Sequence, residues 1–292
     1  MKPLPFTYHR PTSRVEVDAL LAQHGDEAKI LAGGQSLVPL LNLRLVAPGH
    51  LIDVNDLASE TTEPRSEEGW LTIGPLVRHA AVERSALIEQ AAPLLAEAIR
   101  SIGHPAIRSR GTVIGSVAHA DPAAELPAVL LLLDAEAVLS GPAGHRTVPA
   151  HDLFVGVFET CLAPDEWVVE IRIPVGAGPR TGALEEFARR HGDFALCGAA
   201  ATVTSAENGA RIDLAYFGVG GLPRRIELGT YPPDALAGDD LVSAVRDVAL
   251  PTLEPRNDVH ASARYRLWLA ERLGARAIRR AAAIAIPSGG SA

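Results

Sequence analysis

A glycine pair between a short apolar strand and an apolar helix is the strongest constraint on the fold. The segment ILAGGQSLVPLLNLRL, residues 30–45, places Gly33, Gly34, Gln35 and Ser36 at this junction. Successive backbone N–H groups in such a turn form a concave anion site, to which the following helix N-terminus adds positive charge. The pattern therefore predicts a strand–turn–helix unit that is either a phosphate site or a tight turn with Ser36 as the N-cap.

The rest of the sequence argues against several other classes of protein. Neither GxGxxG nor GK[ST] occurs, so the glycine pair belongs to neither a Rossmann nor a P-loop fingerprint. The net charge of −8 argues against a nucleic-acid partner. Cys161 and Cys197 are the only cysteines, too few for an iron–sulfur cluster, and we expect two buried thiols in a reducing cytoplasm. The apolar run at 128–139 is too short to span a bilayer, and residues 1–13 lack the apolar core of a signal peptide.

Local patterns predict two small α/β units followed by a third. The first unit is a helix that Ser13 and Glu16 cap and Gly25 ends, then the glycine-pair strand and helix, then HLIDVNDL as a strand with alternating faces. The second contains a strand in 67–77, helices at about 79–85 and 93–102, a long irregular segment in 103–139 that leads to a helix and a strand, and the strand EWVVEIRIP.

A rise in Gly, Pro and Thr at 175–182 predicts a domain boundary. Beyond it, LEEFARR, CGAAATVTSA and ARIDLAYFGVGG are predicted strands. The final helix has apolar residues at helical spacing, namely Ala261, Tyr265, Trp268, Leu269 and Leu273. Its arginines are interpreted as a solvated face or a partner contact, namely Arg264, Arg272, Arg276 and Arg280.

A second small-residue segment, RGTVIGSVAHADPAAELP at 110–127, repeats the chemistry of the first. It offers Thr112, Gly115 and Ser116, and then His119, Asp121 and Glu125. Two such segments on two units can clamp one extended ligand, with N–H groups on a diphosphate and carboxylates or hydroxyls on a sugar chain. Asp121 and Glu125 have no third ligand at a suitable spacing, so no metal site is predicted.

Several motifs in this order resemble a known family. AGGQSLVPLLNLRL, LIDVNDL, LTIGPLVRH and RGTVIGSVAHADPAAELPA, followed by RRHGDFALCGAAATV, FGVGGLPRR and HASARYRLWLAERLGARAI, cover nearly the whole chain. Together they resemble the FAD-binding medium subunit of molybdenum hydroxylases, of the carbon monoxide dehydrogenase medium-subunit and xanthine dehydrogenase FAD-domain type.

The resemblance implies an α+β fold in three parts. A vanillyl-alcohol-oxidase or PCMH-type FAD-binding domain spans 1–176, with α/β subdomains at about 1–57 and 58–176 that hold FAD between them. A C-terminal α/β domain of the carbon monoxide dehydrogenase flavoprotein type spans 180–285, and 286–292 is a flexible tail.

The resemblance also implies the FAD contacts. The first loop, whose N–H groups hold the diphosphate, consists of Ala32, Gly33, Gly34, Gln35, Ser36 and Leu37. The second loop contributes Thr112, Gly115 and Ser116. The resemblance also places His119 beside the cofactor and Glu125 on the ribityl or diphosphate side of FAD. HGDFAL places Phe194 near the isoalloxazine ring, and Asp193 is either a carboxylate near that ring or a turn residue.

Two positions depart from the family pattern. Ile114 precedes Gly115 where the family has a glycine pair, and Pro75 stands where alanine is usual. An isoleucine would be strained at 114 if that position required a positive φ or a close approach to flavin.

The implied function is electron transfer. Such a subunit takes electrons from iron–sulfur clusters of a small subunit, while a large subunit carries molybdopterin, and it passes them to an external acceptor. No catalytic acid or base is expected in this chain, and the substrate and the acceptor are not encoded in it. The alternatives are a stand-alone FAD-dependent oxidase or dehydrogenase and a flavin-less structural subunit.

Overall fold

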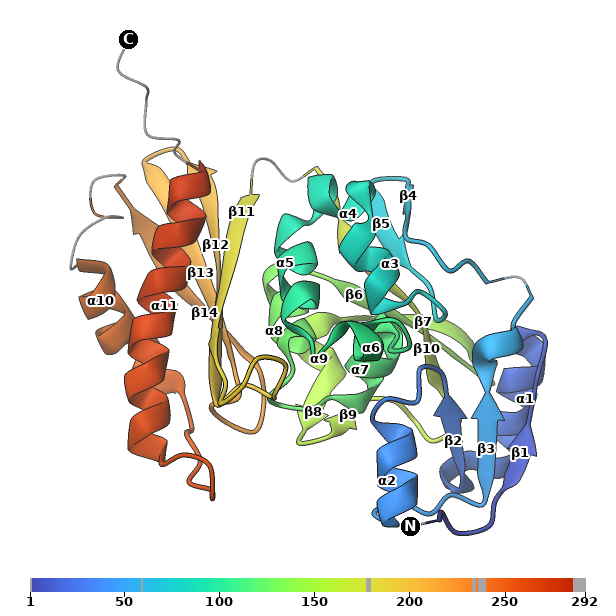
Figure 1. Ribbon diagram of the computed structural model, residues 1–292. Helices are drawn as coiled ribbons and strands as arrows, with labels where there is room; N and C mark the ends of the chain where they lie inside the picture. Colours follow the sequence, from blue (N-terminus) through green and yellow to red (C-terminus); the bar gives the residue numbers. More distant parts are fainter. Residues whose placement is uncertain (1, 59, 177–179, 233–234, 236–239, 286–292) are drawn as a thin grey trace.

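Figure 1 shows the computed structural model of the chain, which describes residues 2–58, 60–176, 180–232, 235 and 240–285. A three-stranded, a five-stranded and a four-stranded sheet follow one another along the sequence, and the five-stranded unit lies between the other two. Strands and helices mix within each unit, which confirms the α+β class.

The first unit, blue in Figure 1, is a parallel sheet in the order β1-β3-β2 with two α-helices. Its elements are β1 (Thr7–His9), α1 (Arg14–His24), η1 (Gly25–Glu27), β2 (Ala28–Leu31), α2 (Leu37–Leu43), β3 (His50–Asp53) and η2 (Val54–Asp56). Helix α1 begins at the predicted cap, because the Ser13 side chain accepts a hydrogen bond from the Glu16 N–H, and it ends at Gly25.

The first unit shares its core with the second. Val17 and Ile52 pack in one cluster with Val138 and Trp167 of the five-stranded sheet. At this contact Asp18 accepts hydrogen bonds from the Trp167 ring N–H at 2.7 Å and from the hydroxyl of Ser140. A buried polar contact of this kind fixes the two units in one relative position.

Three expectations for the first unit were wrong. Strand β3 does not alternate, because it is the central strand and both Leu51 and Ile52 are buried. Strand β1 was not predicted, since a strand of three residues, two of them exposed, carries no periodic signal. Ser36 stands at the N-cap position of α2 but makes no capping hydrogen bond, because its own backbone is already helical.

The second unit is an antiparallel sheet in the order β4-β5-β10-β6-β7, with helices and a two-stranded hairpin around it. Its elements are β4 (Arg65–Glu67), β5 (Trp70–Ile73), α3 (His79–Arg84), α4 (Ala86–Ala91), α5 (Pro93–Ser101), α6 (Pro105–Arg108), α7 (Val113–His119), α8 (Glu125–Leu132), β6 (Glu136–Gly141), β7 (Gly144–Pro149), α9 (Ala150–Leu153), β8 (Phe154–Gly156), β9 (Glu159–Thr160) and β10 (Trp167–Pro174).

The segment expected to be long and irregular is largely helical. It contains α6 and α7 before α8, so Gly115, Ser116 and His119 lie on a helix rather than in a loop. The prediction failed because Gly111 and Gly115 are typical of loops, whereas Val113, Ile114 and Val117 are buried and hold the helix against the core.

The third unit is an antiparallel meander, β11-β12-β13-β14, with the long helix α11 on one face and α8 of the second unit on the other. Its elements are β11 (Arg180–Phe187), β12 (Cys197–Ala206), β13 (Gly209–Phe217), β14 (Arg224–Tyr231), α10 (Asp240–Ala244), the π-helix η4 (Val245–Ala249), η5 (Leu250–Thr252) and α11 (Ala263–Ala285). Part of the predicted boundary at 175–182 lies outside the described residues. The whole of the predicted tail at 286–292 lies outside them as well.

Helix α11 differs from its predicted amphipathic pattern at one turn. Leu269 and Leu273 are buried as expected, but Tyr265 and Trp268 are exposed and stack on one another. Arg272 lies 4.0 Å above the Trp268 ring, so one of the predicted solvated arginines is held by a cation–π contact. Over the described part of the chain, no helix combines the length and the apolar character needed to cross a bilayer.

Candidate functional site

The two glycine segments meet directly. A Cβ atom on Gly33 would lie 2.5 Å from the carbonyl oxygen of Arg110 and 2.7 Å from the Cα of Gly111. Gly34 has a φ of +70°, a conformation that L side chains rarely adopt. Gly33 is thus required for contact between the two segments and Gly34 for the turn. We call this contact, residues 33–36 against 110–112, the glycine junction.

The first segment offers several free hydrogen-bond donors. Within the described residues, no hydrogen bond uses the backbone N–H of Gly33, Gly34, Gln35 or Ser36. The Gln35 side chain donates to the Gly33 carbonyl at 3.0 Å, which stiffens the turn without using these donors. Four consecutive unpaired N–H groups that are only half-buried fit a multiply charged anion such as a diphosphate.

Two arginines and an asparagine surround the junction. The Arg78 guanidinium donates to the Arg110 carbonyl and to the Asn55 side chain, which in turn donates to the Ala32 carbonyl at 2.9 Å. Burial and the neighbouring charge of Arg110 both lower the pKa of Arg78. Two close guanidinium groups repel each other, and a bound anion would relieve that repulsion.

Most N–H groups of the second segment are already hydrogen-bonded. Thr112 is the N-cap of α7, and its side chain accepts from the Gly115 N–H at 3.0 Å. The Val113 N–H donates to the Val77 carbonyl, which also ties α7 to the segment before α3. Ser116 is half-buried one position further along the same helix. The first segment therefore supplies more free N–H groups than the second.

Ile114 is not strained. It lies inside α7 with an ordinary helical backbone, and its side chain is buried in the core of the second unit. The departure from the family's glycine pair is accommodated because the side chain points into the core, away from the solvent-accessible junction. Pro75 is likewise buried, in the turn between β5 and α3.

Helix α7 links the glycine junction to a cavity. Its seven residues span about 10 Å at 1.5 Å per residue. At its C-terminal end, the His119 ring packs on Phe158 with 5.0 Å between ring centroids, and the Phe158 N–H donates to the Ala120 carbonyl. Burial lowers the pKa of His119, so it is neutral at pH 7.

The cavity has a volume of about 670 Å³ and lies between the second and third units. Pro122 and Phe158 line it from the second unit, and Asp193, Phe194 and Arg256 from the third. Phe194 is 62% exposed at the rim of this cavity. Asp193 and Phe194 line the cavity, and His119 adjoins it through its contact with Phe158. Asp193 is exposed, and its N–H donates to the Arg190 carbonyl in a turn.

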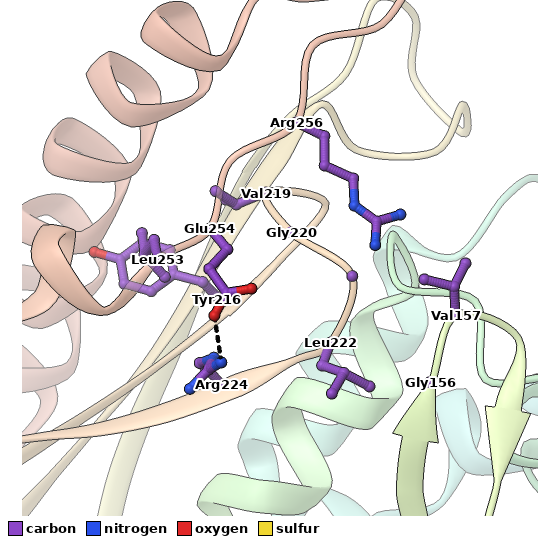
Figure 2. A pocket seen from close by; sticks show the side chains of 11 residues that line it. Gly156, Val157, Tyr216, Val219, Gly220, Leu222, Arg224, Leu253, Glu254 and Arg256 are labelled. Carbon is purple, nitrogen blue, oxygen red and sulfur yellow. Dashed lines mark hydrogen bonds and ion pairs between the residues drawn. The ribbon is translucent and has the colours of Figure 1, made fainter.

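A smaller cavity of about 210 Å³ adjoins the large one and shares Val157 and Arg256 with it. Figure 2 shows Arg256 extending from the third unit toward Val157 of the second. Arg224 and Glu254 form an ion pair at 2.9 Å on the side of the third unit. The cavity continues the interface between the units and contains no cluster of catalytic groups.

Three carboxyl groups lie between the second and third units near the start of α8, with Glu125 buried and Asp121 and Glu186 half-buried. Burial raises the pKa of Glu125 to about 8 and that of Glu186, on β11, to about 7, and it also raises the pKa of Asp121. The negative charges of Glu186 and Asp121 raise the pKa of Glu125 further. One Glu186 oxygen is buried without a hydrogen-bond partner among the described residues. Such groups accept from ligand hydroxyls, which fits a polyol chain.

Sequence reasoning missed several residues of the site. Asn55 and Arg78 lie in the quoted segments LIDVNDL and LTIGPLVRH but were not predicted as site residues. Asn55 follows the carboxyl end of a parallel strand, where ligands of α/β sheets bind. Phe158, Glu186 and Arg256 are distant in sequence from both glycine segments, and only the packing of the units brings them near. The predicted residues 32–37 and 112–125 lie together along the junction and α7, whereas 193 and 194 reach the site from the third unit.

Comparison with known families agrees with this geometry. Residues 4–176 match the FAD binding domain in molybdopterin dehydrogenase, and residues 182–281 match the CO dehydrogenase flavoprotein C-terminal domain. The chain belongs to this family of FAD-binding oxidoreductase subunits, and FAD is its cofactor. The predicted fold of a PCMH-type FAD domain followed by a carbon monoxide dehydrogenase flavoprotein domain is thereby confirmed.

Individual relatives align over almost their whole length. The chain is 41% identical over 288 residues to the 6-hydroxypseudooxynicotine dehydrogenase complex subunit alpha of Paenarthrobacter nicotinovorans, covering 96% of this chain and 97% of that one. It is 40% identical over 287 residues to the caffeine dehydrogenase subunit beta of Pseudomonas sp. (strain CBB1), covering 97% and 96%. A chain of the reconstituted CO dehydrogenase from Oligotropha carboxidovorans superposes with a TM-score of 0.90 at 32% identity, covering 97% and 99%.

Proposed function

We propose that this chain is the electron-transfer subunit of a heteromeric molybdenum hydroxylase. It would receive electrons from the iron–sulfur clusters of a small subunit, while a large subunit with molybdopterin oxidises the substrate, and pass them to an external acceptor. Bound FAD supplies the redox chemistry, because a flavin exchanges electrons with both one-electron and two-electron partners. The observation that carries the proposal is the glycine junction, where four free N–H groups and two arginines converge.

The chain's own residues would bind and orient the cofactor. The N–H groups of residues 33–36, with Arg78 and Arg110, would hold the diphosphate. Ala32 and Leu37 flank these donors, and Thr112, Gly115 and Ser116 would close the other side. The carboxyl of Glu125 would accept hydrogen bonds from the ribityl chain, and His119, Asp193 and Phe194 would lie around the isoalloxazine ring in the large cavity.

The visible absorption spectrum of the purified chain, followed by release and identification of the chromophore, tests cofactor binding. We expect a flavin spectrum and one FAD per chain. A chain that is colourless and takes up no added FAD would contradict the site and favour a structural subunit. The unstrained Ile114 speaks against that alternative, since its side chain occupies the core.

Capture of the chain from its host tests the partners. We expect two further chains, one with iron–sulfur clusters and one with molybdopterin, in equal amounts. After anaerobic reduction of the captured complex, an added dye should be reduced only when this chain carries FAD. A chain that is isolated alone, and whose flavin an organic substrate reduces directly, would instead be a stand-alone dehydrogenase.

We further propose the domain limits 1–176 and 180–285, with subdomains at about 1–57 and 58–176, and a cytoplasmic location. Separate sheets support the limits. The free thiols of Cys161 and Cys197 support the location, because disulfides are rare in a reducing compartment. Limited proteolysis with mass spectrometry of the fragments, and fractionation of host cells, test the two proposals.

A further inference from the structure

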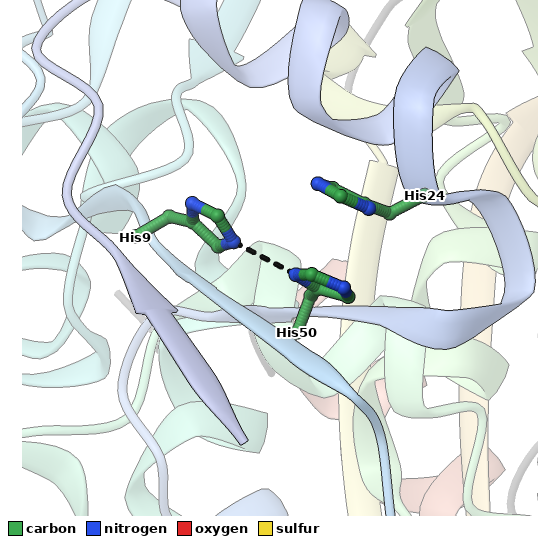
Figure 3. A group of neighbouring side chains, drawn as sticks. All are labelled: His9, His24 and His50. Atoms are coloured by element: carbon green, nitrogen blue, oxygen red, sulfur yellow. Dashed lines mark hydrogen bonds between the residues drawn. The ribbon is translucent and has the colours of Figure 1, made fainter.

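Three histidines converge in the first unit, on elements that the flavin site does not use. His9 ends β1, His24 ends α1 and His50 begins β3. One ring nitrogen from each lies within 4.8 Å of the other two. Figure 3 shows the three side chains in the space between the end of the helix and the two strands.

The rings are packed against one another rather than against other polar groups. The His24 and His50 rings stack with 3.5 Å between centroids, and His9 Nε2 lies 2.9 Å from His50 Nδ1. Within the described part of the chain, this His9–His50 contact is the one hydrogen bond made by the six ring nitrogens. A set of half-buried imidazoles usually has more partners than this, and no carboxylate in the cluster balances a positive charge.

The protonation state of the cluster suits a metal. Burial, and then the proximity of His50 and His24, lower the pKa of His9. Neutral imidazole is the form that binds metal ions, and the His9–His50 hydrogen bond can be replaced by two metal–nitrogen bonds after a change of tautomer.

We propose that His9, His24 and His50 form a site for a divalent transition-metal ion, with Zn²⁺ as the principal candidate. Three imidazole nitrogens and a solvent molecule would complete a tetrahedral set. Nitrogen ligands of this kind select zinc and its neighbours, whereas Mg²⁺ and Ca²⁺ need oxygen ligands.

The position of the cluster indicates a structural role. His50 begins β3, and Asn55, which contacts the glycine segment, follows the other end of the same strand. In this parallel sheet the metal site and the flavin site therefore lie at opposite ends of β3. A bound ion would join β1, which pairs with β3 over three residues, to the end of α1. It should stabilise the first unit and leave the flavin spectrum unchanged.

Calorimetric titration of the tag-free, metal-stripped holoprotein with Zn²⁺ tests the site. We expect one ion per chain and a rise in the unfolding temperature. The His24→Gln variant should bind at least about tenfold more weakly, since even loss of an outer partner of a ligand costs that much. The matched control is His151→Gln, because His151 is exposed and lies outside the cluster. It should bind Zn²⁺ as the unmodified chain does.

The bound ion can also be identified by its ligands. X-ray absorption at the zinc edge should show only nitrogen or oxygen neighbours at about 2.0–2.1 Å. Equal affinity in the unmodified chain and His24→Gln, or binding well below one ion per chain, would overturn the proposal. So would a sulfur neighbour at about 2.3 Å, which would place the ion on a cysteine. Circular dichroism of each variant checks that the fold is retained.

Discussion

The two ends of α7 present two different kinds of binding surface. At its N-terminal end, the glycine junction is built from backbone N–H groups and two arginines and is open to solvent. At its C-terminal end, the cavity between the second and third units is built from side chains such as Phe158 and Phe194, with Glu125 and Glu186 buried nearby. The first suits a charged group and the second an apolar ring with a polyol attached.

This difference explains which half of the site can be predicted from the sequence. A backbone surface needs particular residues at consecutive positions, so it leaves a compact motif. A side-chain cavity is assembled from distant segments, and its members are ordinary residues until the fold brings them together. The following variants test whether the two ends act as separate parts of one site.

The largest effect, a change in how stability depends on pH, is expected for Glu125→Gln, which alters the buried carboxyl group near the cavity. The folded chain holds Glu125 protonated up to a pKa of about 8, above its ordinary value of 4.5, so the folded state binds more protons than the unfolded state between these values. Its stability therefore falls as pH rises from about 4.5 to 8. The variant should match the unmodified chain at pH 5 and be more stable by a few kcal/mol at pH 8, at about 1.4 kcal/mol per pKa unit.

Chemical unfolding of the flavin-free chains at both pH values measures this difference. Glu67→Gln is the control, since Glu67 is exposed and should change stability little at either pH. A Glu125→Gln variant whose advantage is the same at pH 5 and pH 8 would show that Glu125 is ionised in the folded chain.

The next effect is expected at the glycine junction, in Gly33→Ala. The added methyl group would meet the Arg110 carbonyl at 2.5 Å, and forcing the two segments apart should cost about 1–3 kcal/mol. FAD binding should weaken at least tenfold because the N–H donors are displaced. Gly49→Ala is the control, since its nearest neighbour would be 3.9 Å away. Equal FAD affinity in the two variants, measured by fluorescence titration, would separate the junction from the cofactor.

A smaller effect is expected for Arg78→Gln, which removes a positive charge and the link between Asn55 and the second segment. FAD affinity should fall about tenfold, or 1.4 kcal/mol. It should also depend less on salt than in the unmodified chain, because a screened attraction has been removed. Arg84→Gln, at the exposed end of α3, should change neither property. An unchanged salt dependence in Arg78→Gln would mean that Arg78 acts only as a structural link.

The smallest effect is expected at the rim of the cavity, in Phe194→Leu. Because Phe194 is 62% exposed, stability should change by less than about 0.5 kcal/mol. Loss of aromatic contact with a flavin ring should weaken FAD binding by about 0.5–1.5 kcal/mol. Tyr265→Leu, an exposed aromatic on α11, is the control for FAD affinity. A fully unchanged FAD affinity and flavin fluorescence in Phe194→Leu would place the ring elsewhere.

Local structure could be predicted from the sequence wherever contacts between residues close together in the chain determine it. The Ser13 cap and Gly25 end of α1 were predicted correctly because the contacts lie within four residues. Helix α7 was not predicted, because the burial of Val113 and Ile114 outweighs the preference of two glycines for a loop. Strand β1 was not predicted, because only its pairing with β3 defines it. The family resemblance supplied the third-unit residues, and the contact between Arg78 and Arg110 required the fold.

A crystal structure of the chain with bound FAD would show directly whether the glycine junction and the large cavity hold the cofactor. We expect the diphosphate within hydrogen-bond distance of the N–H groups of Gly33, Gly34, Gln35 and Ser36, and the isoalloxazine ring in the cavity beside Phe158 and Phe194. A diphosphate bound away from these N–H groups, or a ring outside that cavity, would contradict this expectation.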